Sequence, residues 1–281
     1  MNNVPGICRI CGNTLVAQDW GGAGCGRCGS VSATILPTEQ ELNKYYERYN
    51  ETYEGGHSGG QNLNRYSRRY FSILKRIIKK GEIIDIGPSK SPFPNLCDQN
   101  GFSVTVMDFV KPKELATKVS FIEGNLNDKS SLNLILGRFD IVSAWAVIEH
   151  VQQPKLAVEI LTSLCKPSGY VIVSTPEIGT FLTKNSVGHS GWFHPPMHLH
   201  LISPLGMRTL FAQNDFALVK WGRLELNLMR YCLRYGLGLF EAIIGVLVKK
   251  VNQHKWDELN NKRVARFKGI LYFIFKRPHS I

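Results

Sequence analysis

Strand-like and helix-like patterns alternate along the middle of the chain. Short apolar runs of the kind that form buried strands of a parallel sheet occur at 83–86, 104–107, 119–122, 141–144 and 170–174. Segments between them predict helices near 92–100, 129–136 and 154–165. This alternation predicts a doubly wound, Rossmann-like α/β domain with helices on both faces of its sheet.

Helical periodicity flanks this region on both sides. Apolar residues recur at helical spacing from 65 to 80, with basic residues mostly off that face, and predict an amphipathic helix packed on the core. A tyrosine-rich helical connector, ending in the glycine-rich loop 55–60, is expected before it. After the last parallel strand, a helix from Ser203 to about Asn214 and a strand over 216–221 are expected to close the domain.

Four of the seven cysteines form two Cys-x-x-Cys pairs near the start of the chain. The pairs are Cys8 with Cys11 and Cys25 with Cys28, and a glycine follows each pair. Each pair offers two thiolates from one tight turn, so that together they supply the four ligands of a tetrahedral zinc ion. We therefore predict a zinc ribbon whose metal is structural, because four protein ligands leave no open position for catalysis.

Two disulfides or a redox dithiol are the alternatives for these cysteines. Disulfides need an oxidising compartment, and the first residues lack the basic start and apolar run of a signal peptide. A cytoplasmic protein with reduced thiols is the expectation. The longest weakly charged apolar stretch, 235–248, contains an acidic residue and is shorter than a membrane-spanning helix.

Candidate ligand-binding residues follow the predicted strands. Asp85 and Gly87 lie at the end of the first strand, and Asp108 follows the second about 20 residues later. Ligands of doubly wound folds bind at the carboxyl ends of the strands, where such a carboxylate grips ribose hydroxyls and a glycine turn admits the ligand closely. A nucleoside cofactor is predicted, although either aspartate alone could be structural.

At this point the chain resembles the class I S-adenosyl-methionine-dependent methyltransferases, in particular the bacterial group that acts on small molecules. The resemblance covers roughly residues 66–220 and rests on the order and spacing of several motifs. These are Ile84-Asp85-Ile86-Gly87, Asp108, Phe139-Asp140-Ile141-Val142, Glu149-His150-Val151, the Lys166-Pro167-Ser168-Gly169 turn into an apolar strand, and Thr175-Pro176-Glu177.

The resemblance implies a role for each matching position. It places Asp85 and Gly87 beside the methionine part of the cofactor, Asp108 on the ribose, Asn125 and Leu126 around the adenine, and Trp145 and Ala146 near the reactive end. The chain departs from the family in its first turn, where Ser89 and Ser91 replace two glycines. Because glycine permits close backbone approach, a non-catalytic binding module with a degenerate cofactor site is one alternative.

Histidines provide the candidates for an acceptor base. Transfer to a hydroxyl requires an aligned acceptor and removal of its proton, which histidine performs near neutral pH. We predict His194 or His198 as the base, with His150 behind them; His198 and His200 alternate on a predicted strand and could share one face. Metal binding by His189, His194, His198 and His200, or a hydrogen-bonded loop, are the alternatives. The Glu149–His150 pair is interpreted first as orienting its loop.

Charge is concentrated in the C-terminal part of the chain. The net charge is +12, and residues 220–281 contain thirteen Lys or Arg against four acidic residues. Apolar runs at 237–248 and 270–275 interleave with these basic clusters, which predicts a helical extension lying on an anionic membrane surface. A helical lid, a dimer interface and RNA contact are the alternatives.

The resulting hypothesis is a cytoplasmic methyltransferase, peripheral at the inner face of the membrane, that uses S-adenosyl-methionine and a structural zinc. It would methylate an oxygen or nitrogen of a small-molecule or lipid-linked sugar acceptor, as in polysaccharide biosynthesis. An RNA methyltransferase is the runner-up, disfavoured because the predicted zinc ribbon carries few charges. The expected organisation is a zinc ribbon at 1–36, a helical connector at 37–65, a methyltransferase domain at 66–223 and a helical basic extension at 224–281.

Overall fold

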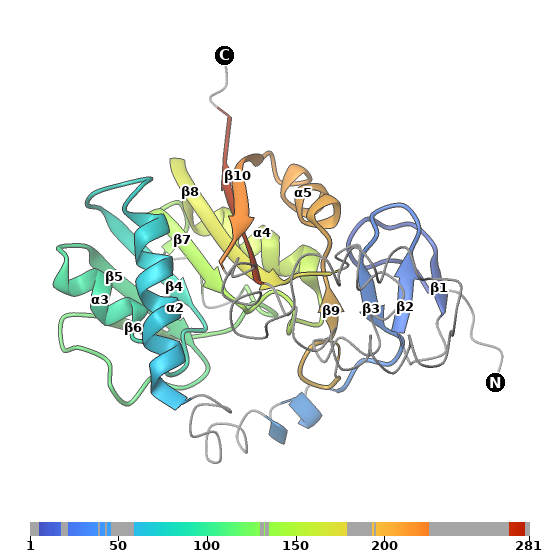
Figure 1. The fold of residues 1–281 in the computed structure, drawn as a ribbon, viewed down its shortest axis with the longest axis horizontal. Helices are drawn as coiled ribbons and strands as arrows, with labels where there is room; N and C mark the ends of the chain where they lie inside the picture. The colour runs from blue at the N-terminus through green and yellow to red at the C-terminus, as the bar shows by residue number, and fades with distance from the viewer. Residues whose placement is uncertain are drawn as a thin grey trace, which may run out of the picture.

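The computed structural model of the chain contains two sheets, a large one in the centre and a small one formed mainly by the N-terminal residues (Figure 1). The structure describes residues 6–17, 22–38, 40–42, 44–45, 59–129, 132, 135–178, 193, 195–224 and 270–278. Within these residues no helix is long and apolar enough to cross a membrane.

The larger sheet has seven strands in the order β10-β11-β8-β7-β4-β5-β6. Its strands are β4 (Glu82–Ile86), β5 (Ser103–Asp108), β6 (Ser120–Glu123), β7 (Phe139–Trp145), β8 (Cys165–Pro176), β10 (Ala217–Arg223) and β11 (Ile270–Lys276). The neighbours from β6 to β8 pair in parallel, whereas β11 is antiparallel to both β8 and β10. Each of the five predicted parallel strands overlaps one of these, which confirms the Rossmann-like sheet.

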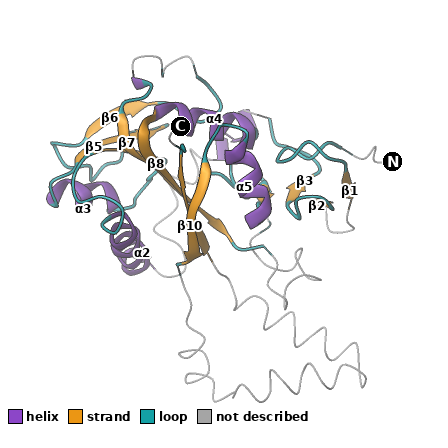
Figure 2. Cartoon of the chain, turned by 90° about the horizontal axis from the view of Figure 1, so that it is seen from above, coloured by secondary structure: helices purple, strands orange, loops and turns teal. Residues whose placement is uncertain are grey.

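Helices cover both faces of this sheet, as predicted (Figure 2). The helices are α2 (Gly59–Leu74), α3 (Phe93–Gln99), α4 (Pro154–Leu164) and α5 (Pro204–Ala212). Side chains of successive strand residues point to opposite faces: Ile83 packs in the cluster of α2 and α3, and Ile84 in that of α4 and α5. α2 begins and ends six residues before the helix predicted at 65–80, and the helix predicted at 129–136 lies largely outside the described residues.

The last apolar run of the chain corrects the prediction of a helical membrane-binding extension. Ile270–Lys276 is not part of a surface helix but forms β11, which lies between β8 and β10. Leu271 packs with the cluster on one face of the sheet and Ile270 with the cluster on the other. A strand buried on both faces is apolar at consecutive positions and therefore has no period that separates it from an apolar helix. Residues 225–269 of the expected extension lie outside the described residues.

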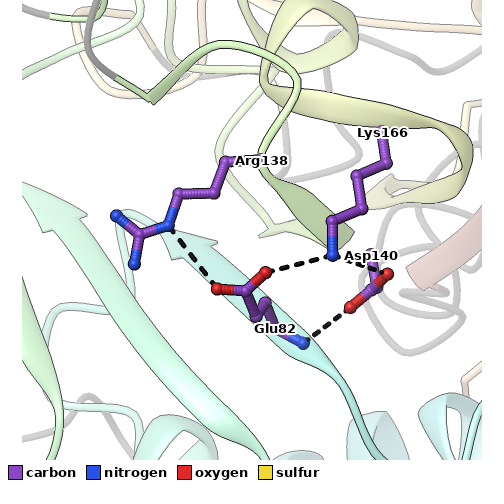
Figure 3. Close-up of polar contacts among 4 residues, drawn as sticks. All are labelled: Glu82, Arg138, Asp140 and Lys166. Atoms are coloured by element: carbon purple, nitrogen blue, oxygen red, sulfur yellow. Dashed lines mark hydrogen bonds and ion pairs between the residues drawn. The ribbon is translucent and has the colours of Figure 1, made fainter.

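Charged side chains at the amino edge of the sheet form a paired network (Figure 3). Lys166 Nζ lies 3.0 Å from Glu82 Oε2 and 3.0 Å from Asp140 Oδ1. Asp140 Oδ2 also accepts the Glu82 backbone N–H at 2.8 Å, and Arg138 Nε lies 3.6 Å from Glu82 Oε1. These contacts tie together the starts of β4, β7 and β8, the three strands at the centre of the fold.

The smaller sheet has the order β1-β2-β3-β9 and is antiparallel throughout. Three of its strands come from the N-terminal region: β1 (Leu15–Ala17), β2 (Gly22–Cys25) and β3 (Val31–Ala33). The fourth, β9 (His200–Leu201), comes from the segment between β8 and α5. The cysteine-bearing region is thus joined to the larger domain by strand pairing (Figure 1).

Candidate active site

The turn after β4 brings a buried carboxyl and a glycine to the carboxyl edge of the sheet. Asp85 is buried, and its Oδ1 accepts a 2.5 Å hydrogen bond from Ser143 Oγ, while its Oδ2 has no hydrogen-bond partner among the described residues. Burial raises the pKa of Asp85 to about 8, against the opposing effect of Ser143. Gly87 has φ +63°, and a Cβ there would lie 3.1 Å from Val147 Cγ2. The position therefore requires glycine.

Asp108 is the last residue of β5, and its carboxylate is hydrogen-bonded to the same turn. Its Oδ2 accepts the Ser89 N–H at 3.0 Å and its Oδ1 accepts the Phe109 N–H at 2.8 Å. Burial raises the pKa of Asp108, and these two N–H groups oppose the shift. Ser89 has φ +50°, the left-handed conformation that glycine adopts most easily. The turn thus keeps a glycine-like backbone conformation at a position where the sequence has lost the glycine.

The residues after β6 and β7 border the same edge. Leu126 is buried, and Asn125 Oδ1 accepts the Asn127 N–H at 2.6 Å. Trp145 is also buried, with no hydrogen-bond partner for its Nε1 within the part of the chain that the structure describes. Ala146 has φ +55°, and its N–H bonds to Ser174 Oγ at 2.9 Å. These four of the seven predicted cofactor positions therefore end or follow strands at this edge, while their contacts to adenine and to the reactive end remain predictions.

Tyr70, which helical periodicity places on the apolar face of a helix, packs against a predicted cofactor residue. Its ring stacks on Trp145 with centroids 4.0 Å apart and planes 10° from parallel. Burial raises the pKa of Tyr70, and the neighbouring groups Tyr66, Glu149 and Asp85 raise it further. Helical periodicity does not predict this stacking, because every tyrosine on the apolar face of a helix follows the same period.

A carboxyl and two imidazoles converge beside this edge. Glu149 is fully buried, and neither of its carboxyl oxygens has a hydrogen-bond partner within the described residues. The ligating atoms of Glu149, His150 and His198 all lie within 4.8 Å of one another, and His150 Nε2 is 4.0 Å from Glu149 Oε1. Burial raises the pKa of Glu149 to about 8. The cluster brings His198, one of the two predicted bases, together with His150, the residue expected behind it.

The hydrogen bond of His150 fixes its tautomer. Its Nδ1 lies 2.9 Å from the Met197 carbonyl oxygen. A carbonyl oxygen can only accept, so Nδ1 carries the proton and Nε2, which faces Glu149, is the basic nitrogen. The rings of His150 and His198 lie 4.7 Å apart. The pair therefore presents at least one nitrogen able to take a proton.

The other histidines singled out in the sequence lie outside this cluster or outside the described residues. His200 does not join the cluster: its Nδ1 lies 2.9 Å from Ser32 Oγ of the smaller sheet. Burial lowers the pKa of His200 to about 3, so it is neutral at physiological pH. His198 and His200 thus contact different partners. His189 and His194, which include the other candidate base, lie outside the described residues.

The four N-terminal cysteines form a cluster of the size that zinc requires. All four Sγ atoms lie within 4.8 Å of one another, with Cys8 to Cys28 at 3.7 Å and Cys11 to Cys25 at 3.4 Å. A tetrahedron with bonds of about 2.3 Å has edges of about 3.8 Å, whereas a disulfide requires about 2.05 Å, and the cysteines are free thiols. The cluster therefore fits a zinc ribbon.

The glycines after each pair adopt the left-handed conformation. Gly12 and Gly29 have φ +78° and +70°, and each donates its N–H to the carbonyl of the first cysteine of its pair. These left-handed turns close the two knuckles around the thiols. Four sulfur ligands would leave a bound zinc no open position, so the chemistry of this donor set is structural.

Comparisons with known proteins agree with this architecture. The family described as "Methyltransferase domain" matches residues 60–220, more than half of the chain. A ubiquinone biosynthesis O-methyltransferase of Vibrio campbellii is 29% identical over 103 residues, which are 34% of this chain and 43% of that protein. The chain thus spans less than half the length of this curated relative.

Two solved structures share the fold. The first is the 1,6-didemethyltoxoflavin-N1-methyltransferase of Burkholderia thailandensis with bound 1,6-didemethyltoxoflavin and S-adenosylhomocysteine. Its TM-score is 0.55 at 12% identity, with 94% of this chain and 98% of that chain covered. The second is an N-methyltransferase of Haemonchus contortus in complex with phosphomonomethylethanolamine and S-adenosylhomocysteine. Its TM-score is 0.50 at 16% identity, with 86% and 58% covered.

Proposed function

The chain belongs to the methyltransferase domain family and contains a class I S-adenosyl-methionine-dependent methyltransferase domain, and we propose that it methylates a hydroxyl oxygen of a small-molecule or lipid-linked sugar acceptor. The observation that carries this proposal is the convergence of Glu149, His150 and His198 beside the carboxyl edge of the sheet. A hydroxyl must lose its proton during methyl transfer, and this cluster supplies nitrogens to take it.

The residues at the carboxyl edge fit the cofactor. Asp85 Oδ2 and Trp145 Nε1 are buried polar atoms without partners among the described residues, and such atoms are satisfied when a polar ligand binds. Asp108 would accept the ribose hydroxyls, and Gly87 lets the cofactor approach the backbone. When bound, S-adenosyl-methionine supplies an electrophilic methyl group on a sulfonium. The left-handed Ser89 preserves the turn, which argues against a degenerate site.

The proton of the acceptor hydroxyl passes to an imidazole in this scheme. His150 Nδ1–H is held by the Met197 carbonyl, so its Nε2 receives the proton. The imidazolium that forms lies 4.0 Å from Glu149 Oε1, and its positive charge favours ionisation of this buried carboxyl, whose carboxylate form then stabilises the imidazolium. His198, next to His150, aligns the acceptor or takes the proton itself. His194 stays a candidate from the sequence.

Single substitutions distinguish these roles. Methyl transfer from tritiated S-adenosyl-methionine would be measured with sugar nucleotides, lipid-linked sugars, phenols and amines as acceptors. We expect His150→Gln to lower kcat about 100-fold or more while the Kd for the cofactor stays unchanged, and His198→Gln to raise KM for the acceptor if it only aligns it. Arg208→Gln, exposed on α5, is the surface control. Wild-type kcat in both histidine variants would overturn the proposal.

The basic C-terminal region supports a lipid-linked acceptor. Residues 225–269 contain nine Lys or Arg against four acidic residues, and such a segment attracts an anionic lipid surface. Since β11 belongs to the sheet, truncation at 224 would remove a core strand. Arg223 pairs with Leu271, so a short Gly-Ser linker can replace 226–268 and preserve both strands. Loss of binding to anionic vesicles, with cofactor binding retained, is expected; unchanged vesicle binding would exclude this role.

A further inference from the structure

The segment between β8 and α5 belongs to both parts of the molecule. β9 pairs with β3, with Ser32 opposite His200 and Val31 opposite Leu201, and so completes the zinc-ribbon sheet. The Ala33 N–H extends this ladder by donating to the Leu199 carbonyl at 2.8 Å. The same segment contains His198, which belongs to the candidate active site.

Side-chain bonds reinforce this pairing at the second cysteine knuckle. Ser203 Oγ donates to the carbonyl of Cys28, a predicted zinc ligand, and its N–H donates to Ser30 Oγ at 3.1 Å. Ser203 Oγ also accepts the Gly206 N–H at 2.9 Å and thereby caps α5. His200 Nδ1 meets Ser32 Oγ at 2.9 Å. The second knuckle and β3 therefore hold the segment through His200 and Ser203.

The opposite side of the segment holds the catalytic cluster. The N–H groups of Leu199 and His200 both donate to the Glu149 carbonyl, at 2.9 and 3.1 Å. The Met197 carbonyl accepts from His150, as described above. These backbone contacts, which hold the segment of His198 beside Glu149 and His150, thus belong to a segment whose other edge is bonded to the ribbon.

The ribbon and α5 pack tightly against each other. Ile10, Cys25 and Cys28 belong to the same hydrophobic cluster as Met207 and Leu210. At Gly206 on α5, an added Cβ would lie 2.3 Å from Ser30 Oγ and 3.1 Å from Ile10 Cγ2. The contact therefore accepts a glycine and nothing larger without movement of the ribbon.

We propose that the zinc-loaded ribbon is the positioning element of the acceptor site, with Ser32 and Ser203 as positioning residues that fix His198 beside Glu149 and His150. The ribbon acts through β9, so the metal takes no part in the chemistry and instead stabilises the knuckle that carries Cys28 and Ser30. This inference rests on the proposed function for its effect on rate, but its structural claim is independent of which histidine is the base.

Gly206→Ala tests the proposal without altering any zinc ligand. The variant should keep one zinc per chain, measured with a chromogenic chelator, and wild-type S-adenosyl-methionine affinity by calorimetry. We expect the ring resonances of His150 and His198 in ¹⁵N-histidine NMR spectra to shift, and kcat to fall about tenfold or more because small misplacements at a reacting centre are costly. Gly26→Ala, where a Cβ meets nothing within 4 Å, is the matched control.

Ser32→Ala gives a milder second test if Gly206→Ala fails to fold. It removes the bond to His200 alone and should shift the same resonances by a smaller amount. Unshifted His150 and His198 resonances in a folded variant whose ribbon has moved, or after zinc removal by a chelator, would overturn the proposal. Shifted resonances with an unchanged rate would support the ribbon's positioning role and would instead count against the cluster as the source of the acceptor base.

Discussion

The carboxyl groups at the two edges of the parallel sheet differ in burial and in hydrogen bonding. At the amino edge, Glu82 and Asp140 are about one-third exposed, and each contacts Lys166, whose pKa these bonds raise. At the carboxyl edge, Asp85 and Glu149 are fully buried, and three of their four oxygens have no hydrogen-bond partner in the described part of the chain. The carboxyl groups of the amino edge are thus paired with a cation, whereas most carboxyl oxygens of Asp85 and Glu149 have no hydrogen-bond partner among the described residues.

This difference separates stability from function. A buried polar group without a partner costs roughly 1–3 kcal/mol, so carboxyl oxygens that lack a partner within the described residues oppose folding. Perturbed titratable groups of this kind concentrate at functional sites. The amino edge is held by ion pairs within the chain, whereas the carboxyl edge is where the proposed function places a polar ligand. Four substitutions, taken from the largest expected effect to the smallest, test this contrast.

Asp108→Ala should cause the largest change, in cofactor affinity. Hydrogen bonds to a charged group contribute about 1.5–3 kcal/mol, so the Kd for S-adenosyl-methionine should rise about 10- to 100-fold. Calorimetry on the purified proteins measures this directly. Asp140→Ala, at the opposite edge, is the control and should leave the Kd within about twofold. Equal losses in both variants would abolish the distinction between the edges.

Glu149→Gln should change how stability depends on pH. The pKa of Glu149 in the folded protein, about 8, lies above the ordinary value of 4.5. The folded state therefore binds this proton more tightly, and the stability it contributes is full below about pH 4.5 and lost as the pH rises through 8. The variant keeps the shape of the neutral acid and should gain roughly 1–3 kcal/mol over wild type at pH 8.5.

Urea unfolding at pH 5.5, 7 and 8.5 measures this difference. Asp85, whose pKa is also about 8, remains in the variant and preserves part of the pH dependence, so Asp85→Asn combined with Glu149→Gln should flatten the curve further. Parallel curves for wild type and Glu149→Gln would show that Glu149 is not held protonated by burial.

Asp140→Asn should have a moderate effect on stability alone. The substitution removes the anionic partner of Lys166 and weakens the bond to the Glu82 N–H. A loss of about 1 kcal/mol in the free energy of unfolding is expected, with cofactor affinity and methyl-transfer rate unchanged. A change in either functional quantity would show that the two edges are coupled through the strands.

Lys166→Gln should have the smallest effect. Its ion pairs with Glu82 and Asp140 are about one-third exposed, and such pairs contribute about 0.2–1 kcal/mol. The loss should shrink further in 0.5 M salt, because screening weakens exposed pairs. Denaturant unfolding at two salt concentrations is the measurement, and a loss above 2 kcal/mol would place this network among the main stabilising features.

Local patterns were sufficient where a residue's role depends on its neighbours in the chain. The five parallel strands follow from short apolar runs, and the two knuckles follow from Cys-x-x-Cys-Gly, whose glycines take the left-handed conformation that the turn requires. Asp85, Gly87 and Asp108 were found because each directly follows or ends a strand. Chain order alone brings such positions to one edge of a parallel sheet.

Local patterns failed where the environment comes from distant segments. The run 270–275 was assigned to a surface helix, yet it is a strand buried on both faces, because β8 and β10 enclose it. Helical periodicity places Tyr70 on a helix face, and only the fold stacks its ring on Trp145, a predicted cofactor residue. The different partners of His198 and His200 likewise depend on the ribbon, which lies more than 160 residues earlier in the chain.

The sequence by itself determined the class of sheet, the candidate cofactor positions and the four cysteines that cluster, since periodicity and spacing are properties of the chain. Only the tertiary structure decided that Glu149, His150 and His198 meet, that β9 completes the ribbon sheet and that β11 lies inside the larger one. The physical reason is that these features arise from pairing and burial between segments far apart in the chain. No local pattern encodes the partner that another segment will supply.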